Sequence, residues 1–112
     1  MRATRPNPVL TALAATLAVF LFDPSAPASA KEMRVTISNF TFEPETTAIA
    51  RGETVRFVNS DDMVHVVVAT DGSFRSEALD TGDSFTAAFT KPGSFTYFCG
   101  LHPFMKGTIV VK

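Results

Sequence analysis

Three residues with metal-binding side chains lie close together near the C-terminus. Cys99, His102 and Met105 are spaced as Cys-x2-His-x2-Met, and Cys99 is the only cysteine of the 112-residue chain. A thiolate, an imidazole and a thioether are soft or borderline donors, which suit copper better than calcium or magnesium. Zinc competes for cysteine and histidine, but structural zinc sites rarely use a thioether. The spacing therefore predicts a redox copper centre that needs one more histidine.

The chain contains one further histidine, His65. It lies where a polar loop ends and the apolar run of residues 63–69 begins. A run that is apolar at nearly every position favours a central strand covered on both faces. Because His65 is far from Cys99 in the sequence, a shared metal ion would join two distant segments.

Each of these residues also has an ordinary structural explanation. A lone cysteine is commonly a small buried hydrophobe, and a methionine before a strand is commonly core filler. Either histidine alone could be a plain loop or strand residue. A nucleophilic pair of Cys99 and His102 also fits the spacing, but it leaves Met105 and His65 unexplained. The combined pattern favours metal ligation, and we find no catalytic constellation that predicts an enzyme.

The two segments together resemble the cupredoxins, the small blue-copper proteins. The resemblance rests on the Asn59-x5-His65 spacing, the C-terminal Cys-His-Met loop and the stretch 40–44. The short loop, with Pro103 and Phe104 inside it, is most similar to that of the amicyanins. The resemblance implies one copper ion that cycles between Cu(I) and Cu(II). The implied ligands are His65, Cys99 and His102 as a trigonal set and Met105 as a weak axial ligand.

The resemblance also implies roles for residues around the site. Asn59 is expected to form a hydrogen bond across to the cysteine loop and so to orient the ligands. Its alternative role is that of a turn residue favouring the bend at 60–62. An apolar collar around an exposed histidine edge is expected to form a docking surface, unless its side chains serve only packing. The collar residues are Leu101, Pro103, Phe104 and Met63.

The chain after residue 30 shows strand periodicity and no helical spacing. Apolar and polar residues alternate in several short runs rich in β-formers, separated by glycine-containing turns. The stretch 71–81 has little strand character and is expected to be a long crossover loop. The sequence predicts an all-β domain over residues 31–112, and the resemblance implies a cupredoxin-like Greek-key β-sandwich of about seven or eight strands.

Residues 1–30 have the pattern of a cleavable signal peptide. Arg2 and Arg5 precede an apolar run at 9–22, and Ala28-Ser29-Ala30 fits signal peptidase. The apolar run is shorter than the ~18 residues expected of a spanning helix, although an uncleaved anchor is the alternative. We expect cleavage after Ala30, no stable membrane insertion, and export to the periplasm.

The expected mature part is small and weakly acidic. Without Arg2, Arg5 and Asp23 it keeps 8 Lys and Arg and 10 Asp and Glu, so its formal charge is −2. The absence of a basic patch predicts no nucleic-acid partner. The predicted function is single-electron transfer by a monomer between redox proteins. The resemblance implies methylamine dehydrogenase as donor and a c-type cytochrome as acceptor. The alternative function is a copper chaperone or storage module.

Overall fold

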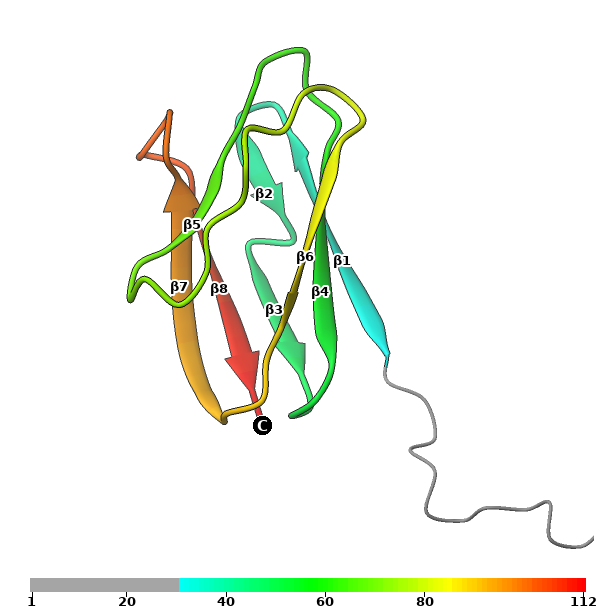
Figure 1. Ribbon diagram of the computed structural model, residues 1–112, viewed down its shortest axis with the longest axis vertical. Helices are drawn as coiled ribbons and strands as arrows, with labels where there is room; N and C mark the ends of the chain where they lie inside the picture. The colour runs from blue at the N-terminus through cyan, green and yellow to red at the C-terminus, as the bar shows by residue number, and fades with distance from the viewer. Residues whose placement is uncertain (1–30) are drawn as a thin grey trace, which may run out of the picture.

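The computed structural model describes residues 31–112, and the predicted signal peptide lies outside the described residues. This part of the chain folds into two four-stranded sheets packed face to face (Figure 1). The prediction of an all-β fold with about seven or eight strands is confirmed, and the described residues form eight. Within residues 31–112 there is no helix long and apolar enough to cross a membrane. The strands are β1 (Glu32–Ser38), β2 (Thr41–Glu43), β3 (Thr46–Ile49), β4 (Thr54–Asn59), β5 (Val67–Ala69), β6 (Ser84–Ala88), β7 (Gly93–Cys99) and β8 (Lys106–Val111).

Each sheet mixes one parallel pair with antiparallel pairs. The first sheet has the order β2-β1-β4-β6, and β1 runs parallel to β4. The second sheet has the order β3-β8-β7-β5, and β3 runs parallel to β8. The chain passes from one sheet to the other between β2 and β3 and at each connection from β3 to β7. These repeated crossings hold the two layers together around one core.

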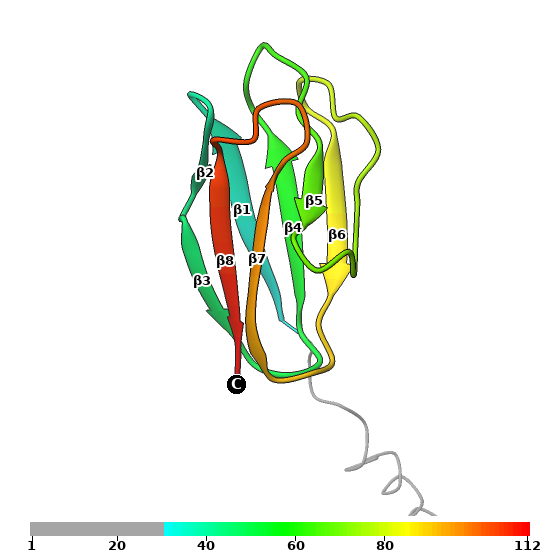
Figure 2. The same ribbon diagram turned by 90° about the vertical axis from the view of Figure 1, so that its left-hand side faces the viewer.

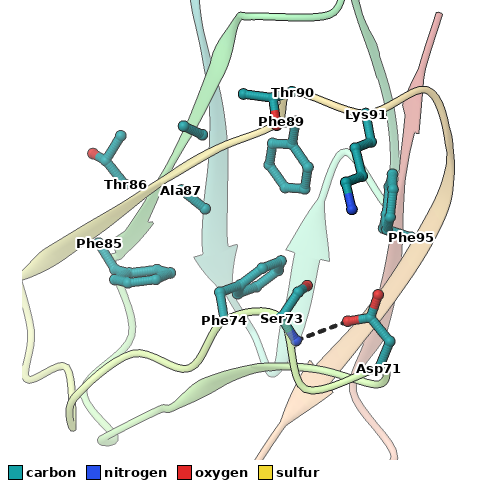
Figure 3. A pocket seen from close by; sticks show the side chains of 11 residues that line it. Asp71, Ser73, Phe74, Phe85, Thr86, Ala87, Phe89, Thr90, Lys91 and Phe95 are labelled. Atoms are coloured by element: carbon teal, nitrogen blue, oxygen red, sulfur yellow. Dashed lines mark hydrogen bonds between the residues drawn. The ribbon is translucent and has the colours of Figure 1, made fainter.

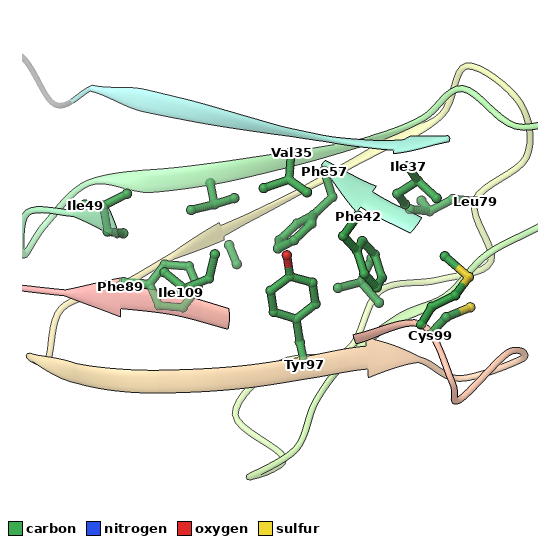
Figure 4. Close-up of a cluster of buried hydrophobic side chains, with 14 of the residues drawn as sticks. Val35, Ile37, Phe42, Ile49, Phe57, Leu79, Phe89, Tyr97, Cys99 and Ile109 are labelled. Atoms are coloured by element: carbon green, nitrogen blue, oxygen red, sulfur yellow. The ribbon is translucent and has the colours of Figure 1, made fainter. Parts of the chain in front are cut away.

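The core follows from the alternation of side chains along the strands. Val35 and Ile37 on β1 are fully buried, as are Tyr97 and Cys99 on β7 at two-residue spacing. Successive side chains of a strand point to opposite faces, so every second residue enters the space between the sheets. Figure 4 shows these residues in a row between the layers, with Cys99 at one end of the row. Tyr97 and Cys99 therefore share the buried face of β7.

Three connections meet at the end of the sandwich opposite the C-terminus (Figure 2). They are the β1–β2 turn, the β4–β5 connection and the β7–β8 loop. The last two contain His65, His102 and Met105, and Cys99 is the residue directly before the β7–β8 loop. The closeness of these connections depends on the sheet order, because β7 lies beside β5 and β1 lies beside β4. The fold thus brings distant polar residues to one end of the core.

The apolar run at 63–69 was expected to form a central strand, and this prediction is wrong. β5 contains only Val67–Ala69, and it lies at the edge of its sheet. Before β5, His65 exchanges two backbone hydrogen bonds with Leu79, at 3.1 and 2.8 Å. The loop between β5 and β6 therefore covers this edge, which explains why an edge segment is so apolar. The predicted crossover loop at 71–81 is confirmed as part of that connection.

A separate hollow of about 410 Å³ lies beside β6 (Figure 3). Phe74, Phe85 and Phe95 line it, and the Asp71 carboxylate accepts a 2.9 Å hydrogen bond from the Ser73 N–H at its rim. None of the predicted metal ligands lines this hollow. Its walls mix four phenylalanines with small, polar and charged residues, and no histidine or cysteine is among them.

Candidate metal centre

Cys99 is the last residue of β7 and its side chain is completely buried. Its backbone N–H donates to the Met105 carbonyl at 3.1 Å, which returns the chain to β8. Its Sγ lies 3.5 Å from the Val66 N–H, which points at the sulfur as a donor. The sulfur thus lies in the core and faces a backbone donor.

His65 approaches the sulfur from the β4–β5 connection. Its ring is completely buried, and its Nδ1 lies 3.5 Å from Cys99 Sγ. The other ring nitrogen, Nε2, lies 2.9 Å from an oxygen of the Asp61 carboxylate. A histidine that binds a metal through one nitrogen commonly bonds a carboxylate or carbonyl through the other, which fixes the ring orientation. Nδ1 is therefore the nitrogen of His65 that is directed to the sulfur.

His102 approaches the sulfur from the β7–β8 loop and is only partly buried. Its Nδ1 lies 3.6 Å from Cys99 Sγ. Two short backbone hydrogen bonds shape the loop: the His102 N–H donates to the Cys99 carbonyl at 3.2 Å, and the Met105 N–H donates to the His102 carbonyl at 2.9 Å. The donor atoms of His65, Cys99 and His102 all lie within 4.8 Å of one another. The structure thus brings together three of the four predicted ligands.

Met105, the predicted axial ligand, lies just before β8. Its side chain is only 2% exposed and belongs to the same hydrophobic cluster as Cys99. This placement is compatible with both roles considered for the residue, namely axial ligand and core filler.

Asn59 has different partners from those expected. Its side-chain amide donates to the carbonyls of Met63 and Leu79, both at 2.8 Å, and its oxygen accepts the Asp61 N–H at 2.9 Å. The expectation of a hydrogen bond to the cysteine loop is therefore wrong. Asn59 ends β4, so its side chain lies inside the loop that follows and joins it to Leu79, the backbone partner of His65. It supports the His65 side of the site.

The four predicted collar residues are all on the surface. Phe104 is 70% exposed, Leu101 54% and Met63 49%, and Pro103 is exposed as well. Phe104 also lies against the His102 ring, with centroids 6.2 Å apart. Large apolar side chains beside a partly exposed histidine form a surface that water solvates poorly.

Two residues beside the site were not singled out from the sequence, namely Asp61 and Phe40. Asp61 could have been found from its position four residues before His65, which places a carboxylate near a predicted ligand. Burial by itself raises the pKa of the Asp61 carboxyl. Hydrogen bonds from the Phe40 N–H, the His65 ring and the Asn39 N–H outweigh burial and hold this pKa below its ordinary value. Nothing in the sequence indicates that the Phe40 ring lies against both histidines.

The donor set suits a transition metal with soft or borderline ligands. One thiol sulfur and two imidazole nitrogens converge in a buried position, and no carboxylate belongs to the cluster. Thiolate and imidazole together favour copper or zinc, whereas calcium, magnesium and manganese prefer oxygen. A small β-sandwich with a buried cysteine between two histidines at one end is the structural class of the type 1 copper proteins.

Comparison with known proteins agrees with this class. Residues 10–111 match the family model for the Cupredoxin-like domain. The chain therefore belongs to the cupredoxin family, and its cofactor is a single copper ion, for which the converging histidine and cysteine side chains are suited.

Individual relatives are similar at moderate identity. The chain is 39% identical to amicyanin from Paracoccus versutus over 74 residues, which covers 62% of this chain and 55% of that protein. It is 29% identical to amicyanin-alpha from Methylorubrum extorquens over the full length of both. It is 37% identical to plastocyanin from Scenedesmus fuscus, across 63% of this chain and 86% of that protein.

Solved structures of other copper proteins have a similar fold. A reduced amicyanin variant superposes with a TM-score of 0.70 at 25% identity, over 78% of this chain and 88% of that one. A purple cupredoxin from Nitrosopumilus maritimus gives 0.67 at 26% identity, over 71% and 99%. A copper-containing nitrite reductase from Thermus scotoductus gives 0.69 at 30% identity, and the match covers 91% of this chain but 27% of the reductase.

Proposed function

We propose that this protein carries single electrons between redox proteins, with His65, Cys99 and His102 as the main copper ligands and Met105 as the axial ligand. The observation that carries the proposal is the convergence of one buried sulfur and two imidazole nitrogens within 4.8 Å. Bound copper supplies a one-electron couple between Cu(II) and Cu(I). The residues that hold it come from a rigid sheet and two hydrogen-bonded connections.

The surroundings of Cys99 support retention of the ion through both redox states. Its sulfur is inaccessible to water, and the Val66 N–H and the two histidines surround it. Because strand β7 and the backbone bridge at His65 fix two of the donors, the chain needs little rearrangement when charge changes. A storage or chaperone site that releases copper needs open, flexible donors instead.

Electron exchange requires a path from the buried sulfur to the surface. His102 supplies it in this proposal, since its ring lies 3.6 Å from the sulfur and is partly exposed. Phe104 lies against the His102 ring, and Leu101 and Met63 are exposed on the two connections at the same end of the sandwich. In this proposal these side chains exclude water from a docked partner. The similarity to amicyanins supports a dehydrogenase as donor and a c-type cytochrome as acceptor. We propose no enzymatic activity.

The proposed location is the periplasm, with cleavage after Ala30 and a monomeric mature domain of residues 31–112. The sequence pattern of residues 1–30 supports this proposal. Mass spectrometry of the exported product tests the cleavage site, and recovery of a membrane-bound form that keeps residues 1–30 would refute it.

Voltammetry of the exported protein with one equivalent of copper tests the proposed function. An electron carrier should give a reversible one-electron wave, and it should keep its copper in both redox states when a chelator is present. A storage or chaperone module should lose Cu(I) to the chelator and give no stable wave. The second result would reject electron transfer in favour of the alternative.

A further inference from the structure

The β1–β2 turn has an unusual residue in a demanding conformation. Asn39 and Phe40 connect Ser38 to Thr41, and their φ angles are 52° and 57°. Two consecutive positive φ angles in a two-residue hairpin define a type I′ turn, in which Asn-Gly is preferred. A bulky residue in the left-handed region is strained and persists only where its surroundings fix it. The second turn position would suit glycine better than Phe40.

The Asp61 carboxylate holds this turn. One oxygen accepts the Asn39 N–H at 2.7 Å and the other accepts the Phe40 N–H at 3.0 Å. The oxygen bonded to Phe40 also lies 2.9 Å from His65 Nε2. A single carboxylate therefore connects the strained turn to the buried histidine. Since the turn belongs to the first sheet and His65 leads into the second, the connection crosses the sandwich.

The Phe40 ring lies against both histidines. Its centroid is 5.6 Å from that of His65 and 5.2 Å from that of His102, and both contacts are edge-on, at 82° and 87°. The two imidazole centroids are 5.1 Å apart. The three rings thus form a nearly equilateral triangle. Edge-on contacts are a favoured arrangement of aromatic rings.

We propose that Phe40 is a positioning residue of the copper site, and that Asp61 holds its ring against both histidines. This inference rests on the proposed function, because it concerns the retention of copper at that site. His65 is anchored by a backbone bridge and by Asp61, whereas His102 lies on a surface loop. The Phe40 ring contacts both histidines, and so it links the loop side of the site to the anchored side. The Phe40 ring is 37% exposed, so core packing does not explain why a strained turn keeps it.

The test compares two glycine substitutions in the same turn. Phe40→Gly and Asn39→Gly both relieve a positive φ angle and keep the N–H that bonds Asp61, but only Phe40→Gly removes the ring. We expect Cu(I) to pass to a chelator about tenfold faster from Phe40→Gly than from Asn39→Gly, since two ring contacts are lost. Phe40→Leu, which keeps apolar volume without a ring, should show the same direction and provides the comparison if Phe40→Gly folds poorly.

Equal rates of copper release from Phe40→Gly, Phe40→Leu and Asn39→Gly would overturn the inference. A second measurement needs no metal: NMR relaxation of the copper-free protein should show a mobile His102 ring in Phe40→Gly and a restrained one in Asn39→Gly. The same His102 mobility in both variants would also overturn it. A wild-type protein that fails to hold copper would instead reject the proposed function, and the NMR comparison would still decide the role of Phe40.

Discussion

Tyr97 lies across Gly107 on the neighbouring strand, so that its phenol ring fills the space where another residue would have its Cβ atom. The ring is 1% exposed and lies between Phe42 and Phe57, with centroids 4.7 and 5.1 Å away. It has no room to move aside. Gly107 is therefore required by the packing of Tyr97, two residues from Cys99, the proposed copper ligand.

We predict that Gly107→Ala lowers the free energy of unfolding by about 1–3 kcal/mol, the usual effect of overpacking a core. Urea unfolding of the copper-free protein measures it. The matched control is the same substitution in a Tyr97→Leu background, where the smaller side chain leaves room. If Gly107→Ala is equally destabilising in both backgrounds, the contact with Tyr97 is not the cause.

We predict that the buried Tyr97 hydroxyl makes the folded protein less stable at alkaline pH. It is buried without a hydrogen-bond partner among the described residues, and burial, followed by the charge of Glu45, raises its pKa. The folded protein keeps this proton above pH ~10, where the unfolded chain loses it, so stability should fall as the pH rises beyond that value. Tyr97→Phe should remove that part of the pH dependence.

Absorbance offers a direct check, because Tyr97 is the only tyrosine of the chain. Tyrosinate should appear only when the protein unfolds. A tyrosinate signal near pH 10 in the folded protein would show that the hydroxyl is hydrated rather than buried.

We predict that a substitution of Asn59 strongly lowers the free energy of unfolding. Its fully buried side chain makes three hydrogen bonds to backbone groups of the His65 connection and of Leu79. We expect Asn59→Ala to lower the free energy of unfolding by about 2–4 kcal/mol, because it leaves buried carbonyls without donors. Asn59→Asp should be worse, since a carboxylate would face the two carbonyls. A loss below about 0.5 kcal/mol in the urea unfolding of Asn59→Ala would mean that Asn59 is an ordinary turn residue.

We predict that a substitution of Met105 changes the reduction potential of the copper protein but not its colour. The side chain is buried beside Cys99, and an axial ligand tunes a type 1 site rather than holding it. Met105→Gln should therefore keep the blue colour of the Cu(II) protein and shift its reduction potential in voltammetry. An unchanged potential would assign Met105 to core packing.

Local patterns indicated the proposed copper ligands, whereas they did not indicate the residues that support those ligands. The Cys-x2-His-x2-Met loop is contained in seven residues, and His65 follows a short motif, so spacing alone indicated both parts. The partners of Asn59 depend on how two loops fold against each other, and sequence spacing does not determine that. The roles of Asp61 and Phe40 depend on contacts between the sheets for the same reason.

The strands also differ in how clearly the sequence predicts them. β1, β4, β6, β7 and β8 are five to seven residues long, which is enough for alternation to be recognised. β2 and β3 have three and four residues, too few for a period of two to be recognised. The run at 63–69 was misread because the loop at Leu79 buries it, and burial by a loop produces the same apolar pattern as burial within a sheet.

The visible spectrum of the Cu(II) protein tests the central claim most directly. The full chain is expressed, and the purified protein is compared with its Cys99→Ala variant at one equivalent of copper. We predict an intense blue band in the wild type, from charge transfer between the Cys99 thiolate and copper, and no such band in Cys99→Ala. A variant that stays blue, or a wild type that binds copper without the intense band, would contradict the assignment of Cys99 as a copper ligand.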